Sequence, residues 1–295
     1  MRSLLFVPGD SRKKLEKGLN SGADALLIDL EDSVALDAKE EARRITTAFL
    51  AEQRQEVQRP RLFVRVNGLT TGLIDADLDS VMRSSPDGIV LPKTVGGTDV
   101  AHLGAKLAVR EAEFGLEDGG TRILAIATEN AAGVFALGTF AGASHRLMGL
   151  TWGGEDLSAD LGAEANRTED GAYTAPYRLA RSLTLFGAAA AGIDAIDSVF
   201  TNFRDLAGLE AECSAARRDG FVAKMAIHPA QVPVINETFT PSAESIERAQ
   251  AVIEAFKAHP GAGVVGVNGE MLDRPHLLRA ERLLRRAGRF VERPA

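Results

Sequence analysis

The sequence predicts an α/β protein built as a (β/α)₈ TIM barrel with a C-terminal helical extension. Eight short apolar runs alternate with longer segments of helical pattern. Each run is almost continuously apolar, which is typical of parallel strands buried on both faces. Polar residues follow most of the runs directly, as expected where barrel strands open onto one face. Eight alternations favour a closed barrel over an open, doubly wound sheet with fewer strands, which is the alternative.

The strands and helices expected in the barrel alternate along the first 235 residues. The predicted strands are 3–7, 24–30, 61–66, 88–91, 122–127, 146–150, 195–200 and 221–227. The predicted helices are 12–21, 38–53, 73–84, 99–113, 131–140, 176–190 and 203–218. Asp10 is the expected N-cap of the first helix, and Gly22 follows its end.

The remaining residues, 236–295, form an extension too small to fold alone, which we expect to pack on a barrel or to cover its mouth. Thr240 and Pro241 are the expected N-cap and first position of a helix that runs to about His259. A short strand, Val264–Val267, and a basic helix over 277–286 follow. The arginines near the end favour a solvated face or a subunit contact: Arg282, Arg285, Arg286 and Arg289.

Composition excludes several classes of protein. Of the 295 residues, 45% are hydrophobic but only 5% aromatic, which suits thin aliphatic layers between strands and helices. A net charge of −7 argues against nucleic acid as the main partner. The lone cysteine, Cys213, excludes an internal disulfide and is expected to be a buried structural thiol. The first apolar run is too short for a signal peptide or a membrane span, so we expect a soluble cytoplasmic protein that binds no membrane.

The stretch 151–162 (TWGGEDLSADLG) is the strongest candidate for a functional site. We interpret it as a strand that ends in a glycine loop presenting Glu155 and Asp156. Carboxylate oxygens are ligands that Mg²⁺ or Mn²⁺ prefers, and glycines allow a ligand to approach the backbone. Glu129, at the end of the preceding strand, is the best second metal ligand. The alternative is that Glu129 only stabilises the start of the next helix.

Other polar residues are expected at the same rim. Glu31 and Asp32 follow the second strand, where they would hydrogen-bond metal-bound water and orient the ligands. Arg65 suits a bidentate clamp on a substrate carboxylate, and an ion pair with Glu31 or Asp32 is the equal alternative. Lys93 is expected to pair with these acids rather than to act as a Schiff-base nucleophile. His228 is expected to be a packed, hydrogen-bonded residue rather than a base.

An ordered set of motifs spans essentially the whole chain and resembles the HpcH/HpaI aldolases, in particular the citrate lyase beta-subunit-like and malyl-CoA or citramalyl-CoA lyase-like group. The motifs are 4–9 (LLFVPG), 28–34 (IDLEDSV), 65–68 (RVNG), 91–93 (LPK), 128–129 (TE) with Gly133, 153–157 (GGEDL) and 224–229 (KMAIHP). The resemblance implies a Mg²⁺-dependent carbon–carbon lyase, with Mn²⁺ as a possible substitute. Such an enzyme cleaves a 3-hydroxyacyl-CoA, such as malyl-, citramalyl- or citryl-CoA, into acetyl-CoA or propionyl-CoA and a 2-oxo acid. It can also form the thioester from these two products.

The same resemblance implies roles for individual residues. Glu129 and Asp156 match the metal ligands, and Arg65 matches the residue that holds the carboxylate of the 2-oxo acid. Asp273 matches a catalytic acid that a C-terminal lid carries to a neighbouring subunit, usually in a homotrimer or hexamer. Backbone N–H groups are implied to bind the 2-oxo acid at Gly154, Glu155 and Asp156. CoA contacts are implied at Phe6, Val7, Lys17, Ile227 and His228.

Two departures from the family pattern fall at 127–130 and 222–224. They bear on the alignment of Glu129 and on the CoA contacts, respectively. Four other functions stay open: a malyl-CoA thioesterase on the same scaffold, the citryl-cleaving subunit of a larger citrate lyase, a non-catalytic CoA-binding or assembly module, and an unrelated Mg²⁺-dependent barrel of the enolase type.

Overall fold

The computed structural model describes residues 1–288 and divides into two compact units, each considered by itself. The first unit is Met1–Glu237, and the second begins at Thr238. Arg289 therefore lies outside the described residues. Within residues 1–288 no helix combines the length and the apolar character that a membrane crossing requires.

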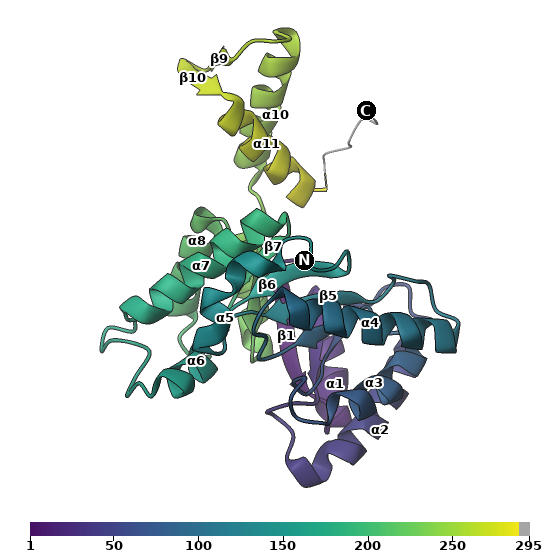
Figure 1. The fold of residues 1–295 in the computed structure, drawn as a ribbon. Coiled ribbons are helices and arrows are strands. Elements are labelled where there is room, and N and C mark those ends of the chain that lie inside the picture. The colour runs from purple at the N-terminus through teal and green to yellow at the C-terminus, as the bar shows by residue number, and fades with distance from the viewer. Residues whose placement is uncertain (289–295) are drawn as a thin grey trace. The chain divides into compact units, whose positions relative to one another are not determined.

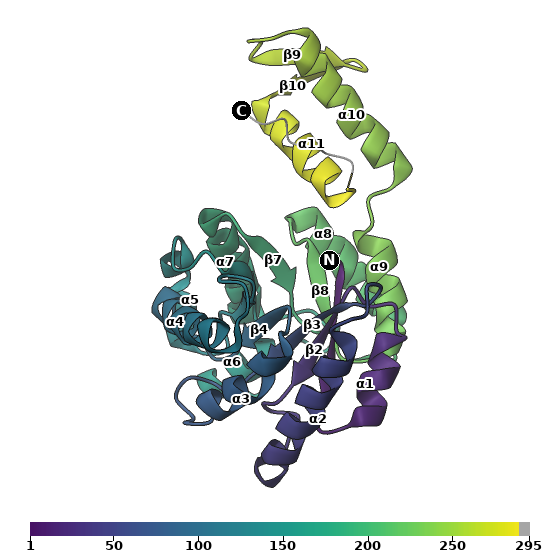
Figure 2. The ribbon, with the colours of Figure 1, turned by 90° about the vertical axis from the view of Figure 1, so that its right-hand side faces the viewer.

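The first unit is a closed barrel of eight parallel strands surrounded by helices (Figures 1 and 2). Every predicted strand is present, and β1 pairs with β8, with Leu4 opposite Met225. This closure confirms the barrel and excludes the open sheet. The strands are β1 Ser3–Pro8, β2 Ala25–Asp29, β3 Arg61–Arg65, β4 Gly88–Leu91, β5 Arg122–Ile126, β6 Leu147–Thr151, β7 Asp194–Asp197 and β8 Ala223–Ala226.

Aliphatic side chains fill the barrel interior, because successive residues of a strand point to opposite faces of the sheet. The buried interior includes Leu4, Leu27, Phe63, Val90, Leu124, Ile196 and Met225. The outward-facing residues pack against the helices. A Cβ atom on Gly18 of the first helix, for example, would lie 3.1 Å from the side chain of Val7. Burial on both faces explains why the strand sequences are continuously apolar.

The helices of the first unit lie outside the strands. They are α1 Arg12–Leu19, α2 Lys39–Gln53, α3 Ile74–Val81, α4 Gly97–Phe114, α5 Ala131–Phe135, α6 Gly154–Leu161, α7 Ala175–Ala191 and α8 Leu206–Asp219, with α9 Val232–Phe239 ending in the second unit. Short 3₁₀ turns are η1 Leu36–Ala38, η2 Met82–Ser84, η3 Leu137–Phe140 and η4 Pro229–Gln231. Two predicted details were wrong. Ser11, not Asp10, precedes α1 at the N-cap, and the segment after β6 is a helix rather than a glycine loop.

The helix α6 begins immediately after Gly153, so both acids of the predicted loop lie in its first turn. Acidic residues are favourable there because they face the positive end of the helix dipole. Gly162 ends the helix in the left-handed conformation, at φ 65°. The two glycines at its start favour a loop in the sequence. The acidic first turn and the C-terminal Gly162 are ordinary signals of a helix.

The described part of the second unit, up to residue 288, contains two helices and a hairpin after the end of α9. Its elements are α10 Ala243–Ala258, β9 Val264–Val267, β10 Glu270–Asp273 and α11 Arg274–Arg286. Ser242, not Thr240, caps α10, and its side chain accepts a hydrogen bond from the backbone of Ser245. Strand β9 was predicted and β10 was missed. The two-residue turn between them, Asn268–Gly269, has positive φ at both positions, the usual chemistry of a tight hairpin.

Candidate active site

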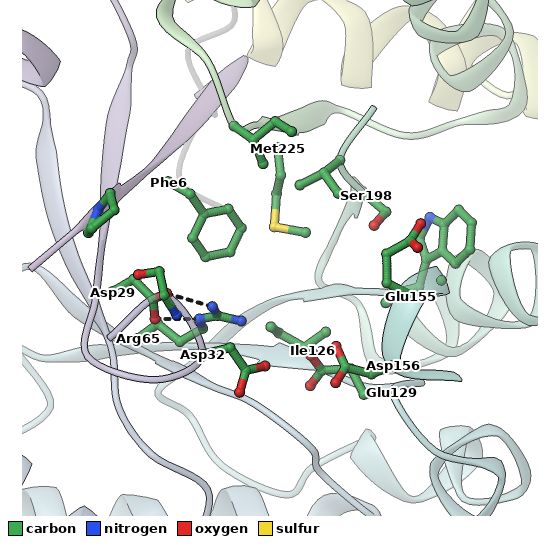
Figure 3. A pocket seen from close by; sticks show the side chains of 17 residues that line it. Phe6, Asp29, Asp32, Arg65, Ile126, Glu129, Glu155, Asp156, Ser198 and Met225 are labelled. Carbon is green, nitrogen blue, oxygen red and sulfur yellow. Dashed lines mark hydrogen bonds and ion pairs between the residues drawn. The ribbon is translucent and has the colours of Figure 1, made fainter. Parts of the chain in front are cut away.

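The carboxyl ends of the barrel strands surround a pocket of about 360 Å³ (Figure 3). Seven of the eight strands contribute to it, either directly or through the segment that follows, and β4 supplies the neighbouring Lys93. Residues far apart in the sequence therefore meet at this rim. The lining residues are Phe6, Pro8, Asp29, Asp32, Ser33, Arg65, Ile126, Glu129, Trp152, Gly153, Gly154, Glu155, Asp156, Ser198, Val199, Met225 and Ile227.

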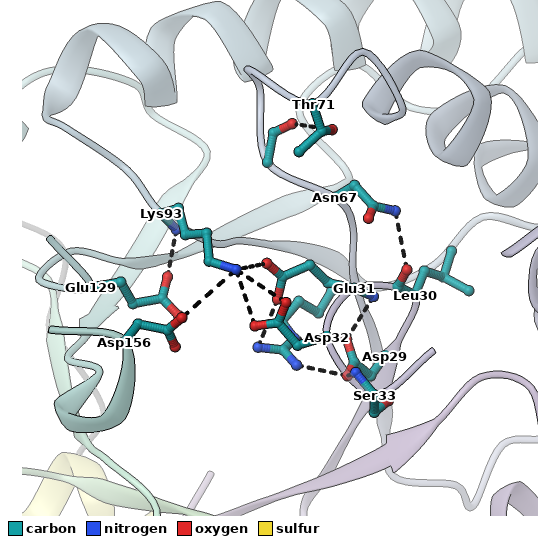
Figure 4. A network of polar contacts seen from close by, with 12 residues as sticks. Asp29, Leu30, Glu31, Asp32, Ser33, Asn67, Thr71, Lys93, Glu129 and Asp156 are labelled. Atoms are coloured by element: carbon teal, nitrogen blue, oxygen red, sulfur yellow. Dashed lines mark hydrogen bonds and ion pairs between the residues drawn. The ribbon is translucent and has the colours of Figure 1, made fainter. Parts of the chain in front are cut away.

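The two predicted metal ligands lie next to each other in the pocket (Figures 3 and 4). Glu129 follows β5 and is only 4% exposed, whereas Asp156 is half-buried in the first turn of α6. Burial, together with the negative charges of Asp156 and Glu31, raises the pKa of Glu129 to about 8. A buried carboxyl group beside other acids is poised to bind a cation, because the cation removes the repulsion between them.

Lys93 connects this pair with the other acids of the rim (Figure 4). Its backbone N–H donates to Glu129, and its ammonium group pairs with Glu31, with Asp32 at 3.0 Å and with Asp156 at 3.7 Å. This is the ion pairing that the sequence predicted. The backbone of Lys93 has φ 54°, a left-handed conformation that is uncommon for a residue with a side chain and occurs often at functional sites.

Arg65 forms ion pairs and also lines the pocket. Its Nε and Nη2 donate to the two carboxylate oxygens of Asp29 at 2.7 and 2.6 Å, and its Nη1 lies 2.9 Å from Glu31 (Figure 3 shows the contact with Asp29). The ion-pair alternative is therefore observed, although its main partner is Asp29 rather than Asp32. A guanidinium group has five N–H donors. The N–H donors of Arg65 that remain can bind a substrate carboxylate. The contact with Asp29 fixes the orientation of the guanidinium group.

The start of α6 supplies the backbone groups of the site. The first N–H groups of a helix have no partner within it, so they favour an anion. Gly154, Glu155 and Asp156 occupy these positions and line the pocket. The carboxylate of Glu155 is instead held by the amide of Asn166, at 2.8 Å. This arrangement agrees with the predicted backbone role for Glu155 and leaves Glu129 and Asp156 as the candidate metal ligands.

Gly153 is required because Glu129 occupies the space beside it. A Cβ atom on Gly153 would lie 2.5 Å from Cγ of Glu129, yet the glycine φ of −121° suits any residue. We therefore expect Gly153→Ala to displace Glu129 and to weaken Mg²⁺ binding about tenfold or more, as other changes beside metal ligands do. Isothermal titration calorimetry measures this, with Gly138→Ala as the control because no atom lies within 4 Å of a Cβ there. Unchanged Mg²⁺ affinity in Gly153→Ala would contradict the placement of Glu129.

The raised pKa of Glu129 predicts that Mg²⁺ affinity depends on pH. Below about pH 8 the metal-free carboxyl group is protonated and must lose its proton before it can bind a cation. Affinity should therefore rise with pH, by up to about tenfold per unit for one proton, and level off above pH 8. Calorimetry at pH 7 in buffers of different ionisation enthalpy should detect proton release. Binding without proton release would show that Glu129 is already ionised.

Of the residues that the resemblance assigns to CoA contacts, some line the pocket and others do not. Ile227 and Phe6 line the pocket, whereas His228 stacks on Phe203 with ring centroids 4.7 Å apart. The Nδ1 atom of His228 also accepts a hydrogen bond from the backbone of Ala230, as expected for a packed residue. Two other residues are not brought into the pocket: Val7 packs toward α1, and Lys17 lies exposed in the last turn of that helix.

Asp273 lies in the second unit, as the last residue of β10 and the N-cap of α11. Its side chain is hydrogen-bonded to His276, which lowers the pKa of its carboxyl group. Its role toward a substrate stays a prediction. Cys213 is buried, as predicted, and burial raises the pKa of its thiol to about 12.

The donor set of the pocket fits a hard divalent ion. Residues 1–288 contain no group of three or more His, Cys, Asp and Glu side chains arranged to hold a metal. Mg²⁺ does not need such a group, because it is usually bound through one or two carboxylates and keeps several waters. Glu129 and Asp156 provide those carboxylates, and the pocket gives space for water and substrate.

Several pocket residues were not assigned from the sequence. Asp29 stands in the motif that contains Glu31, but nothing in its spacing marks it as the partner of Arg65. Trp152 is the only tryptophan of the chain and is fully buried, and a single tryptophan beside two glycines was a usable signal. Ser198 follows β7 and Met225 lies in β8. No charged residue at the end of either strand had been predicted for the site.

Comparisons with known proteins show which family the chain belongs to. The HpcH/HpaI aldolase/citrate lyase family profile matches residues 2–229. The chain belongs to this family. Among HpcH/HpaI family proteins, it is 35% identical to the citrate lyase subunit beta of Leuconostoc mesenteroides subsp. cremoris, over 97% of this chain and 93% of that protein. It is also 35% identical to a (3S)-malyl-CoA thioesterase of Cereibacter sphaeroides, over 97% and 94% of the two chains.

A solved HpcH/HpaI family structure is similar over the full length. It is the CitE protein of Mycobacterium tuberculosis in complex with magnesium, acetoacetate and coenzyme A. The TM-score is 0.76 at 33% identity, and the match covers 97% of this chain and 98% of that one.

Proposed function

We propose that this protein is a Mg²⁺-dependent carbon–carbon lyase that cleaves or forms a 3-hydroxyacyl-CoA. The observation that supports this best is the pair formed by buried Glu129 and Asp156, with Arg65 lining the same pocket. The family membership supports the lyase class, and the magnesium and CoA bound to the similar CitE structure support the cofactor and the substrate class. The substrates proposed are malyl-, citramalyl- or citryl-CoA.

Each residue of the site has its own role in binding the metal or the substrate. Glu129 and Asp156 would hold Mg²⁺, which, when bound, supplies Lewis-acid stabilisation of negative charge on oxygen. Arg65 would orient the substrate carboxylate through the donors that Asp29 and Glu31 leave free. The backbone N–H groups at the start of α6 would bind the same 2-oxo acid portion. Burial of the site makes each of these interactions stronger than it would be in water.

Cleavage converts the hydroxyl-bearing carbon of the substrate into the carbonyl carbon of the 2-oxo acid. The hydroxyl group loses its proton to solvent water, the carbon–carbon bond breaks, and its electron pair passes to the enolate of acetyl-CoA or propionyl-CoA. We assign Asp273 the protonation of that enolate, and in the reverse direction the removal of the α-proton. By the family resemblance, Asp273 would act in the pocket of a neighbouring copy in a homotrimer or hexamer.

A malyl-CoA thioesterase is the second candidate, because the chain is as similar to that relative as to citrate lyase beta subunits. The experiment that separates them incubates the purified protein with a panel of the three thioesters, with and without Mg²⁺, and identifies both products. A lyase yields acetyl-CoA and a 2-oxo acid, whereas a thioesterase yields free CoA and an intact hydroxy acid. CoA binding without metal-dependent turnover would overturn both and favour a binding module.

A further inference from the structure

Six side chains behind the pocket form a closed ring of contacts that begins and ends at Trp152. Its indole N–H donates to Asp197 at 2.8 Å, and Asp197 pairs with Lys224 at 2.9 Å. Lys224 in turn pairs with Glu212 at 2.7 Å. The ring thereby runs from the end of β6 through β7 and β8 to α8.

The remaining two members of the ring, Arg167 and Tyr173, lie outside the barrel strands, in the segment between α6 and α7. Glu212 pairs with Arg167 at 3.0 Å, and the Arg167 guanidinium lies 3.6 Å from the ring centre of Tyr173. Tyr173 meets Trp152 edge to face, with ring centroids 4.9 Å apart. Arg167 and Tyr173 also form a β-bridge with each other, so the segment is a short antiparallel loop.

The loop that Arg167 anchors lies against the substrate-binding turn, residues 153–156. Asn166, the neighbour of Arg167, donates to the carboxylate of Glu155 at 2.8 Å and approaches the carbonyl oxygen of Gly154 at 3.4 Å. Trp152 directly precedes the same turn in the chain. A Cβ atom on Gly154 would lie 3.2 Å from its indole and 3.5 Å from Tyr173. Two members of the ring therefore border this turn, and the neighbour of a third member, Arg167, is hydrogen-bonded to it.

Burial makes the ring stiff. Trp152, Asp197 and Lys224 are each completely buried, and Tyr173 is only 9% exposed. Charges removed from water in this way need all of their partners, because breaking one pair leaves an uncompensated charge. The aromatic and cation–π contacts add preferred orientations. These contacts restrict the movement of the ring, and through it the movement of the attached turn.

We propose that this ring positions the substrate-binding turn for Mg²⁺ and 2-oxo acid binding, with Arg167 as the positioning residue that ties the loop to the barrel. Arg167 itself touches no reacting group in this proposal. Its removal should loosen Asp156 and the backbone donors of α6, although both metal-binding carboxylates remain in the sequence. The proposal rests on the proposed function for its ligand, whereas the rigidity of the ring can be measured without any ligand.

The test variant is Arg167→Gln, and the matched control is Arg146→Gln. Arg146 forms a salt bridge with Glu111 that is even more deeply buried than that of Arg167 with Glu212, but it precedes β6 at the opposite end of the strand. Because Trp152 is the only tryptophan, intrinsic fluorescence reports on the ring alone. Acrylamide quenching of the metal-free protein should rise about twofold in Arg167→Gln, because local opening exposes the indole. It should stay at the wild-type value in Arg146→Gln.

Binding and kinetics complete the test. In Arg167→Gln we expect the Kd for Mg²⁺ and the KM for the thioester to rise about tenfold or more, as for other residues that orient metal ligands. The kcat at saturating Mg²⁺ and substrate should stay within about threefold of wild type, the pattern of lost binding rather than lost chemistry. Arg167→Lys keeps the charge that faces Glu212 and should restore part of the affinity.

Two results would overturn the proposal: unchanged quenching and Mg²⁺ affinity in Arg167→Gln, or equal losses in both glutamine variants, since these would indicate general destabilisation. A wild-type protein that binds no Mg²⁺ would refute the proposed function instead. In that case the quenching comparison would still decide whether the ring holds the turn.

Discussion

Glu129→Gln should abolish Mg²⁺-dependent turnover while leaving the fold intact. The amide keeps the shape of the carboxyl group but removes the charge that binds the cation, so we expect Mg²⁺ affinity to fall about 10–100-fold. Loss of the electrostatic stabilisation that the metal supplies should lower kcat by about 10²–10³-fold. Calorimetry and the product assay measure the two effects separately.

The metal-free stability of the variant provides an independent check. Because burial raises the pKa of Glu129 to about 8, ionising this carboxyl group lowers the free energy of unfolding. The loss develops as the pH rises from the unfolded-state pKa toward the raised value. The glutamine has no such cost, so metal-free Glu129→Gln should melt no lower than wild type at pH 8. Glu155→Gln is the control, because that carboxylate lies on the same helical turn but is held by Asn166. Equal losses in both variants would contradict the assignment of the ligand.

Asp273→Asn should lose turnover yet keep Mg²⁺ and 2-oxo acid binding. Asparagine caps a helix as well as aspartate does, so α11 should start at the same residue. What the variant lacks is the proton that the carboxyl group exchanges with the enolate, an effect of about 10²–10⁴-fold on kcat. Rapid-quench measurement of cleavage and calorimetry with the 2-oxo acid separate the two properties.

The matched control for Asp273 is Glu270→Gln, which changes another exposed acid of the same strand. It should turn over at the wild-type rate. If Asp273→Asn cleaves as fast as wild type, the acid that protonates the enolate lies elsewhere and the proposed lid role fails.

Much of the barrel could be predicted because each strand is buried on both faces and must be apolar along its length. That requirement is local, so runs such as 122–127 can be recognised without any neighbour. The same reasoning placed Glu129 and Asp156 at one rim, because parallel strands of a barrel end on one side. The structure also places Arg65, Glu31 and Lys93 there.

Other features depend on contacts between distant residues and leave no local signal. Asp29 pairs with Arg65 across 36 positions, and Arg167 reaches Glu212 across 45. Neither spacing repeats or matches a helix or strand period. By contrast, α6 and the turn at Asn268–Gly269 carried ordinary sequence signals. The two glycines before α6 favoured a loop interpretation, and the short length of β10 hid its hairpin.

The left-handed backbone of Lys93 affects how mutations at this position should be interpreted. Lys93 already carries a Cβ in this conformation, so alanine there removes the cation without adding backbone strain. Glycine removes the same cation and also relieves the strain, because it has no Cβ. Comparing Lys93→Ala with Lys93→Gly therefore separates the effect of the charge from that of the main-chain geometry that directs the Lys93 amide at Glu129.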